Sequence, residues 1–135
     1  SAMEARFSLK YVIATALTHG SVRLAAFEAP RLGNPDTRAL MQRIETVLDP
    51  ELDAAFPARR AARVTLTTRD GRVETFLQPT RKGDPDAPLS DAELEDKFCE
   101  LTEALIGTPE AHRLLERLWA LEREPDLHFT RARRV

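Results

Sequence analysis

The side chains that can do chemistry in this chain are few, and they lie far apart in the sequence. There is one cysteine, Cys99, and there are three histidines, His19, His112 and His128, without the spacing of a metal site. No histidine lies near Cys99 in sequence, so we interpret it as an inert thiol beside a buried stripe. We interpret His112 and His128 as exposed residues. We interpret His19 as a structural residue at the end of a helix, where the helix dipole favours a cation. These residues indicate no metal site, no cofactor and no nucleophile–base pair.

Two further places invite a functional interpretation. Lys82-Gly83-Asp84 can hold an anion in a loop, or it can be a solvated turn. Tyr11 lies in a helix that is otherwise mostly apolar, on a more polar line with Thr15 and Thr18. Such a tyrosine is either a core residue whose hydroxyl bonds to a neighbour, or a phenol that serves a site. Composition and spacing leave both alternatives open.

The bulk properties favour one domain over residues 1–135. Charged residues make up 31% of the 135 residues and the formal net charge is −2, so the charge balance suggests neither nucleic acid nor an anionic membrane as a partner. A single cysteine excludes a disulfide within the chain and favours a reducing compartment. No apolar run approaches the roughly 20 residues of a membrane span. We therefore expect a cytoplasmic protein.

Helical periodicity dominates the first third of the chain. The segment 4–20 is expected to be one helix that ends at Gly20. Its expected buried positions recur at the helical period: Phe7, Leu9, Val12, Ile13, Ala16 and Leu17. Asn34 is expected to cap a second helix that runs to about Arg43. Residues 44–48 are predicted to form a short strand, which Asp49-Pro50 ends.

The clearest β signal is the hairpin sequence of residues 62–79, "ARVTLTTRDGRVETFLQP". Asp70-Gly71 is typical of a two-residue type I′ turn. That turn predicts four cross-strand pairs: Arg69 with Arg72, Thr68 with Val73, Leu66 with Thr75 and Val64 with Leu77. Four apolar side chains then share one face: Val64, Leu66, Val73 and Leu77.

Two helices are expected to follow the hairpin. Ser90 and Glu93 form a capping box at the start of the first, which Gly107 ends, and Thr108-Pro109 starts the second. The expected buried residues of the first are Leu94, Phe98, Leu101 and Leu105, and those of the second are Leu114, Leu115, Leu118 and Leu121. The fold class is therefore α+β: a small antiparallel sheet of three strands, helices on one face, and two C-terminal helices.

Two stretches resemble the MmgE/PrpD family, whose members include 2-methylcitrate dehydratase of propionate catabolism, cis-aconitate decarboxylase and iminodisuccinate epimerase. The first is "EARFSLKYVIATALTHG", residues 4–20, and the second is "KGDPDAPLSDAELEDKF", residues 82–98. Between them, "NPDTRALMQRIETVLDPEL" and "PARRAARVTLTTRDGRV" fall in the expected order. The resemblance covers nearly the whole chain and corresponds to the C-terminal part of much longer family members.

The resemblance carries further implications. Family enzymes are lyases or isomerases that act on small polycarboxylates without a metal or organic cofactor. Most of their acid–base residues lie upstream of the region seen here, so this chain alone is expected to be inactive. One family active-site tyrosine falls in the "FSLKY" stretch and maps to Tyr11, which is thus the one catalytic residue that the resemblance implies.

These expectations favour the C-terminal domain of a MmgE/PrpD-like enzyme that abstracts an α-proton from a di- or tricarboxylate, with Tyr11 as a donor. The alternative is a non-catalytic protein or fragment that self-associates through its incomplete sheet, giving a homodimer. The residues do not choose between dehydration, decarboxylation and epimerisation.

Overall fold

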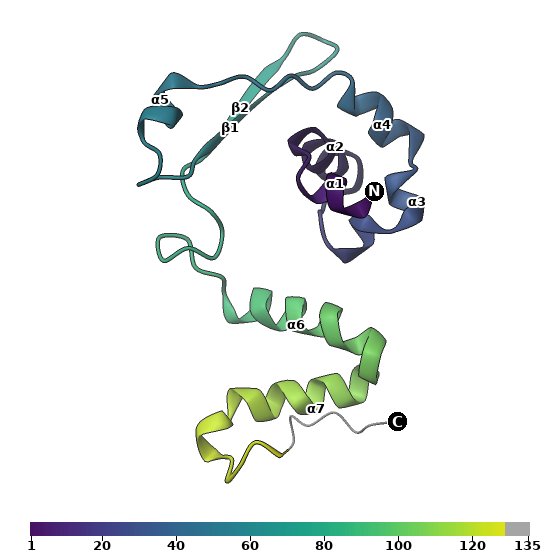
Figure 1. Cartoon of the computed structure of the whole chain (residues 1–135), viewed down its shortest axis with the longest axis vertical. Helices are drawn as coiled ribbons and strands as arrows, with labels where there is room; N and C mark the ends of the chain where they lie inside the picture. The colour runs from purple at the N-terminus through teal and green to yellow at the C-terminus, as the bar shows by residue number, and fades with distance from the viewer. Residues whose placement is uncertain (129–135) are drawn as a thin grey trace. The chain divides into compact units, whose positions relative to one another are not determined.

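The computed structural model describes residues 1–128 of the chain. Within the whole chain two compact units are distinguished, Ser1–Ala58 and Arg59–Val135. Figure 1 shows the helices and strands of both units. The structure is α+β, as the sequence predicts, with helices in both units and one antiparallel sheet. A single domain over residues 1–135 stays a prediction. No helix among residues 1–128 is both long enough and apolar enough to cross a membrane.

The first unit is helical. Its elements, in chain order, are α1 (Ala2–Arg6), α2 (Leu9–His19), the 3₁₀ helix η1 (Leu24–Phe27), α3 (Ala29–Leu32), α4 (Pro35–Met41) and α5 (Pro50–Ala54). α2 contacts α1 and α4, and α1 also contacts α3 and η1. The predicted cap of α4 is confirmed, because the Asn34 side chain accepts a hydrogen bond from the Thr37 N–H at 2.9 Å.

The single helix expected at the N-terminus is two helices. α1 ends at Arg6 and α2 begins at Leu9, because the Ser8 hydroxyl caps the Tyr11 N–H at 3.2 Å and starts a new helix. The predicted end is confirmed. Gly20 has φ +77° and donates its N–H to the Ala16 carbonyl at 2.8 Å.

The buried face of α2 is the opposite of the one expected. Phe7, Leu9 and Leu17 are exposed, whereas Tyr11 and Thr15 are buried. Tyr11 can pack inside because its hydroxyl finds a partner in the Ala26 carbonyl, and the buried Ala14 and Thr15 side chains beside it are small. The apolar stripe predicted from Phe7 and Leu17 is therefore wrong.

The strand predicted over residues 44–48 is also wrong. That segment has no regular structure, and Val47 and Leu48 are exposed. A strand requires a partner, and the sheet has only two strands in the part of the chain that the structure describes. Asp49 instead begins α5, since its side chain accepts hydrogen bonds from the N–H groups of Glu51 and Leu52, with Pro50 at the start of the helix.

The second unit contains the sheet and the C-terminal helices. Its described elements are β1 (Ala62–Thr67), β2 (Val73–Gln78), α6 (Asp91–Ile106), α7 (Thr108–Trp119) and the 3₁₀ helix η2 (Leu121–Arg123). β1 and β2 pair antiparallel. None of the side chains of β1 and β2 is buried. The burial of the sheet therefore gives no sign of the helices that were expected to cover one of its faces.

The hairpin forms, but its register differs by one residue from the prediction. Thr67 pairs with Val73 and Thr65 with Thr75, and the Thr68 N–H donates to the Arg72 carbonyl at 2.9 Å. The loop therefore has three residues and ends on Gly71, with φ +84°, and no non-glycine residue described has positive φ. A type I turn with a glycine bulge thus replaces the type I′ turn.

The shift in register separates the predicted apolar cluster. Val64 lies opposite Phe76 and Arg63 lies opposite Leu77, so Val64 and Leu77 are on different faces. Phe76 is 63% exposed. The prediction of four apolar residues on one face is wrong.

The two C-terminal helices are confirmed, with the predicted boundaries at Ser90, Gly107 and Thr108. Figure 1 shows α7 folding back beside α6, and the two helices are in contact. Their interface is thin. Ala111 is the buried residue of α7 and α6 has none, while Leu101 and Leu105 of the predicted stripe are exposed.

Candidate functional site

Tyr11 is buried in the first unit. Its side chain is 4% exposed, and its hydroxyl donates a hydrogen bond to the main-chain carbonyl of Ala26 in η1. The centroids of the Tyr11 and Phe27 rings are 6.3 Å apart. The Arg6 guanidinium lies over the Phe27 ring, 5.4 Å from its centroid. The packing of α2 against η1 thus holds the phenol in one position.

Two buried threonines lie in the same unit. Thr15 follows Tyr11 by one helical turn, and its hydroxyl has no hydrogen-bond partner among the described residues. Thr37 of α4 is equally buried, but its hydroxyl lies 3.4 Å from Nε2 of His19. His19 stands in the last turn of α2, as predicted, and also contacts α4.

The loop at Lys82-Gly83-Asp84 is closed on itself. The Lys82 ammonium lies 2.9 Å from the Glu93 carboxylate. The Arg81 guanidinium lies 2.9 Å from the Asp84 carboxylate. Gly83 has φ +98°, as a turn requires. Because Arg81 and Lys82 are both paired with carboxylates of this chain, the structure favours a structural turn over an anion-binding loop.

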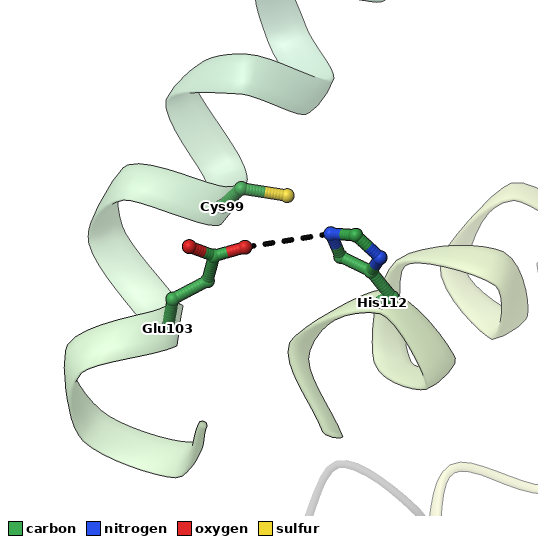
Figure 2. A group of neighbouring side chains, drawn as sticks. All are labelled: Cys99, Glu103 and His112. Carbon is green, nitrogen blue, oxygen red and sulfur yellow. Dashed lines mark ion pairs between the residues drawn. The ribbon is translucent and has the colours of Figure 1, made fainter. Parts of the chain in front are cut away.

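A third group forms between the C-terminal helices. Cys99 and Glu103 lie one turn apart on α6, and His112 lies on α7. Their ligand atoms, Sγ, a carboxylate oxygen and an imidazole nitrogen, are all within 4.8 Å of one another. Figure 2 shows both α6 side chains reaching toward the imidazole, and Glu103 Oε1 lies 3.4 Å from His112 Nε2.

The arrangement does not suit a nucleophile–base pair. Partial burial raises the pKa of the Cys99 thiol, and the negative charges of Glu103, Asp96 and Glu95 raise it further. A triad would also place thiol and carboxylate on opposite nitrogens of the imidazole. In Figure 2 both face the same edge of the His112 ring. The inert-thiol interpretation of Cys99 therefore agrees with the geometry as far as nucleophilic catalysis is concerned.

Sequence spacing missed this group because its members come from two helices. The signal that could have found it is the helical hairpin itself. The Trp119 indole N–H donates a 2.8 Å hydrogen bond to the Glu95 carboxylate, and Gly107 lies midway between these two residues in sequence. Gly107 is also nearly midway between Glu103 and His112, which form the ion pair. Positions equally distant from the turn therefore meet across the hairpin.

Comparison with known proteins identifies the class. The chain matches the model of the MmgE/PrpD C-terminal domain over residues 1–123, and it belongs to this family. The predicted resemblance is thereby confirmed. The chain is also similar to cis-aconitate decarboxylase of Mus musculus, at 29% identity over 95 residues, and of Homo sapiens, at 30% identity over 95 residues.

Both alignments cover 70% of this chain, but only 19% of the mouse protein and 20% of the human protein. The chain therefore spans about a fifth of the length of the curated relatives it matches. What these enzymes do as whole proteins comes to this chain only as a proposal.

Proposed function

We propose that this chain is the C-terminal domain of a lyase or isomerase that acts on a small di- or tricarboxylate. The observation that carries the proposal is the family match over residues 1–123, with cis-aconitate decarboxylases among the relatives. We propose cis-aconitate as the first substrate to test, ahead of 2-methylcitrate, citrate and iminodisuccinate, because decarboxylases of cis-aconitate are the relatives matched. A cytoplasmic location is part of the same proposal.

The proposed reaction is abstraction of a proton next to a carboxylate, without a cofactor. Such a step requires a base, and donors that stabilise the developing negative charge. In the part of the chain that the structure describes, the partner of the Tyr11 hydroxyl is a main-chain carbonyl rather than a carboxylate, an ammonium or an imidazole. From the family resemblance, we propose that most of the acid–base set lies upstream of this chain.

Tyr11 is the residue of this chain proposed to serve the reaction. The support is its match to the family tyrosine in the "FSLKY" stretch and the fixed position of its ring. The phenol has a single proton, and in this structure Ala26 accepts it. A donor role toward substrate therefore requires the hydroxyl to exchange that partner when the site is complete.

The test compares two polypeptides on one substrate panel. A gene map that shows whether coding sequence continues upstream of Ser1 defines the longer one. The chain alone is expected to give no turnover above the blank. The longer polypeptide is expected to release CO₂ from cis-aconitate, to lose water from a hydroxy acid, or to epimerise iminodisuccinate, and product analysis separates the three reactions. Turnover that co-purifies with the chain alone contradicts the proposal that most acid–base residues lie upstream. Inactivity of the longer polypeptide on the whole panel contradicts the proposed lyase or isomerase function.

The exposed sheet favours a second candidate, self-association. Each of the two strands is an edge strand in the described part of the chain, and Val73, Phe76 and Leu77 are exposed. A second copy of this chain could extend the sheet and cover these side chains, giving a homodimer. Sedimentation at micromolar concentration is expected to show a dimer or larger species, and Phe76→Lys should shift it to monomer. A monomer before the substitution contradicts this candidate.

A further inference from the structure

We propose that Cys99, Glu103 and His112 form a binding site for one divalent transition-metal ion, with Zn²⁺ as the expected ion, between α6 and α7. The residues converge from two helices whose contact the structure describes. This proposal does not rest on the proposed catalysis, because its three residues lie in the second unit and Tyr11 lies in the first.

The spacing of the ligand atoms suits a tetrahedral site. Zn²⁺ bonds of about 2.0–2.3 Å to nitrogen, oxygen and sulfur put neighbouring ligand atoms roughly 3.4–3.7 Å apart. Glu103 Oε1 and His112 Nε2 already lie 3.4 Å apart. The Cys99 sulfur is within 4.8 Å of both, so it has to approach them by about 1 Å to reach the spacing of a tetrahedral site.

The ligand types select the metal. A thiolate, an imidazole and a carboxylate suit Zn²⁺, whereas Mg²⁺ and Ca²⁺ prefer sites built from oxygen alone. A thiolate and a carboxylate together neutralise one divalent ion. The Cys99 thiol loses its proton to solvent when the sulfur–metal bond forms, and water supplies the fourth ligand. Asp96 and Glu95, whose charges act on Cys99, add negative potential that favours a cation.

The packing of the hairpin explains what the ion would contribute. Ala111, which is fully buried, lets α7 approach α6 closely at the position directly before His112. Beyond that contact the interface is poor in buried apolar side chains, and Leu105 is 82% exposed. Metal binding to a folded site stabilises that fold, so an ion held by both helices would pin them where apolar packing is thin.

The test uses the full chain, reduced and freed of metal, with ZnCl₂ or CoCl₂ as the only additions. Calorimetry is expected to show one equivalent of Zn²⁺ bound per chain. Co²⁺ is expected to give a thiolate charge-transfer band, which reports a sulfur–metal bond, together with the intense visible bands of a tetrahedral ion. Zn²⁺ should raise Tm, and a chelator should reverse the rise.

Three variants and one matched control identify the ligands. Cys99→Ser should abolish the charge-transfer band, while Glu103→Gln and His112→Asn should weaken Zn²⁺ binding by about 100-fold or more, the upper end of the cost of perturbing a ligand's surroundings. His128→Asn is the control, because His128 is an exposed histidine beside Asp126 in the same unit. It should leave affinity unchanged.

Circular dichroism of each variant without metal checks that its helices form. Absence of the charge-transfer band in the parent chain overturns the proposal. Loss of affinity in His128→Asn equal to that in His112→Asn overturns it as well, and so does binding that survives Cys99→Ser unchanged. The Glu103–His112 contact is then an ion pair and nothing more.

Discussion

The hydroxyl of Tyr11 donates its hydrogen bond to the main-chain carbonyl of Ala26, fifteen residues further along the chain. This contact joins α2 to η1 across a segment that otherwise has little regular structure. It also fixes the direction in which the phenol proton points. Any function of Tyr11 in a larger site begins from that bond.

Replacing Tyr11 by phenylalanine removes the hydroxyl and keeps the ring. If the hydroxyl serves the fold, the stranded Ala26 carbonyl should lower the free energy of unfolding by about 1–3 kcal/mol, as measured by urea denaturation of the chain. If it serves the transition state, kcat of the longer polypeptide should fall by about 10²-fold or more with little change in Tm. Wild-type kcat with a lowered Tm rejects the catalytic proposal.

Thr15→Val tests the cost of the one buried hydroxyl that has no partner among residues 1–128. The substitution keeps the branched shape and removes the unsatisfied polar group. The free energy of unfolding is expected to rise by about 1 kcal/mol, by urea denaturation. Thr37→Val is the matched control, because that threonine is equally buried but its hydroxyl contacts His19, so the same change should destabilise. A loss of stability in both variants contradicts the assignment.

The elements with local signals could be predicted from the sequence. Ser90 with Glu93, Asn34 before Pro35, and Gly107 each begin or end a helix through hydrogen bonds or dihedral angles that depend on a few neighbouring residues. Such signals do not require the rest of the fold, and these helices appear where predicted.

The errors concern what one segment does to another. The predicted strand at residues 44–48 is wrong because no strand among residues 1–128 pairs with it. The hairpin register was predicted wrongly because Asp70-Gly71 fits both a two-residue and a three-residue loop. The backbone of Asp70 distinguishes them, since a type I′ turn requires positive φ at Asp70 and no non-glycine residue described has it. The buried face of α2 was predicted wrongly because apolar character alone was used to choose it, whereas Tyr11 can be buried with its hydroxyl bonded to a main-chain carbonyl.

The candidate sites divide in the same way. Tyr11 was found from the sequence through a family resemblance, and its assignment to catalysis stays a prediction. The Cys99 group was not found, since His112 reaches it only through the close return of α7 along α6.

Glu93 predicts an acid-sensitive start of α6. The Ser90 N–H, at 2.8 Å, and then the Lys82 ammonium, at 2.9 Å, lower the pKa of Glu93 from its ordinary 4.5 to about 2. A depressed folded-state pKa stabilises the fold above the unfolded value, so this contribution is complete above about pH 4.5 and is lost as pH falls toward 2. NMR titration of the Glu93 carboxyl and circular dichroism of the chain measure both effects.

Two variants separate the causes at Glu93. Glu93→Gln keeps a capping side chain without charge, so the loss of helix signal between about pH 4.5 and 2 should shrink. Lys82→Gln removes only the second cause, and the carboxyl should titrate higher than in the parent chain but still below its ordinary value. Titration of Glu93 at its ordinary value in the parent chain contradicts the capping geometry.

Gly107 is the position on which the helical hairpin depends. Its φ of +81° and ψ of 152° belong to a region that essentially only glycine adopts, while a side chain built there meets no atom within 4 Å. Gly107→Ala should therefore lower the free energy of unfolding by about 1–3 kcal/mol through backbone strain alone. Gly33→Ala is the control, because Gly33 has helical angles and its added carbon would lie 3.4 Å from the Ala29 carbonyl, so stability should change little.

Fluorescence of the single tryptophan, Trp119, reports the hairpin directly, since its indole N–H bonds to Glu95 across the two helices. If α7 no longer folds back along α6, the bond between Trp119 and Glu95 is lost. The tryptophan emission should then shift to the red in Gly107→Ala, and it should not shift in Gly33→Ala. Equal stability and equal emission in both variants would mean that the turn tolerates an ordinary backbone and that glycine is not what holds α6 and α7 together.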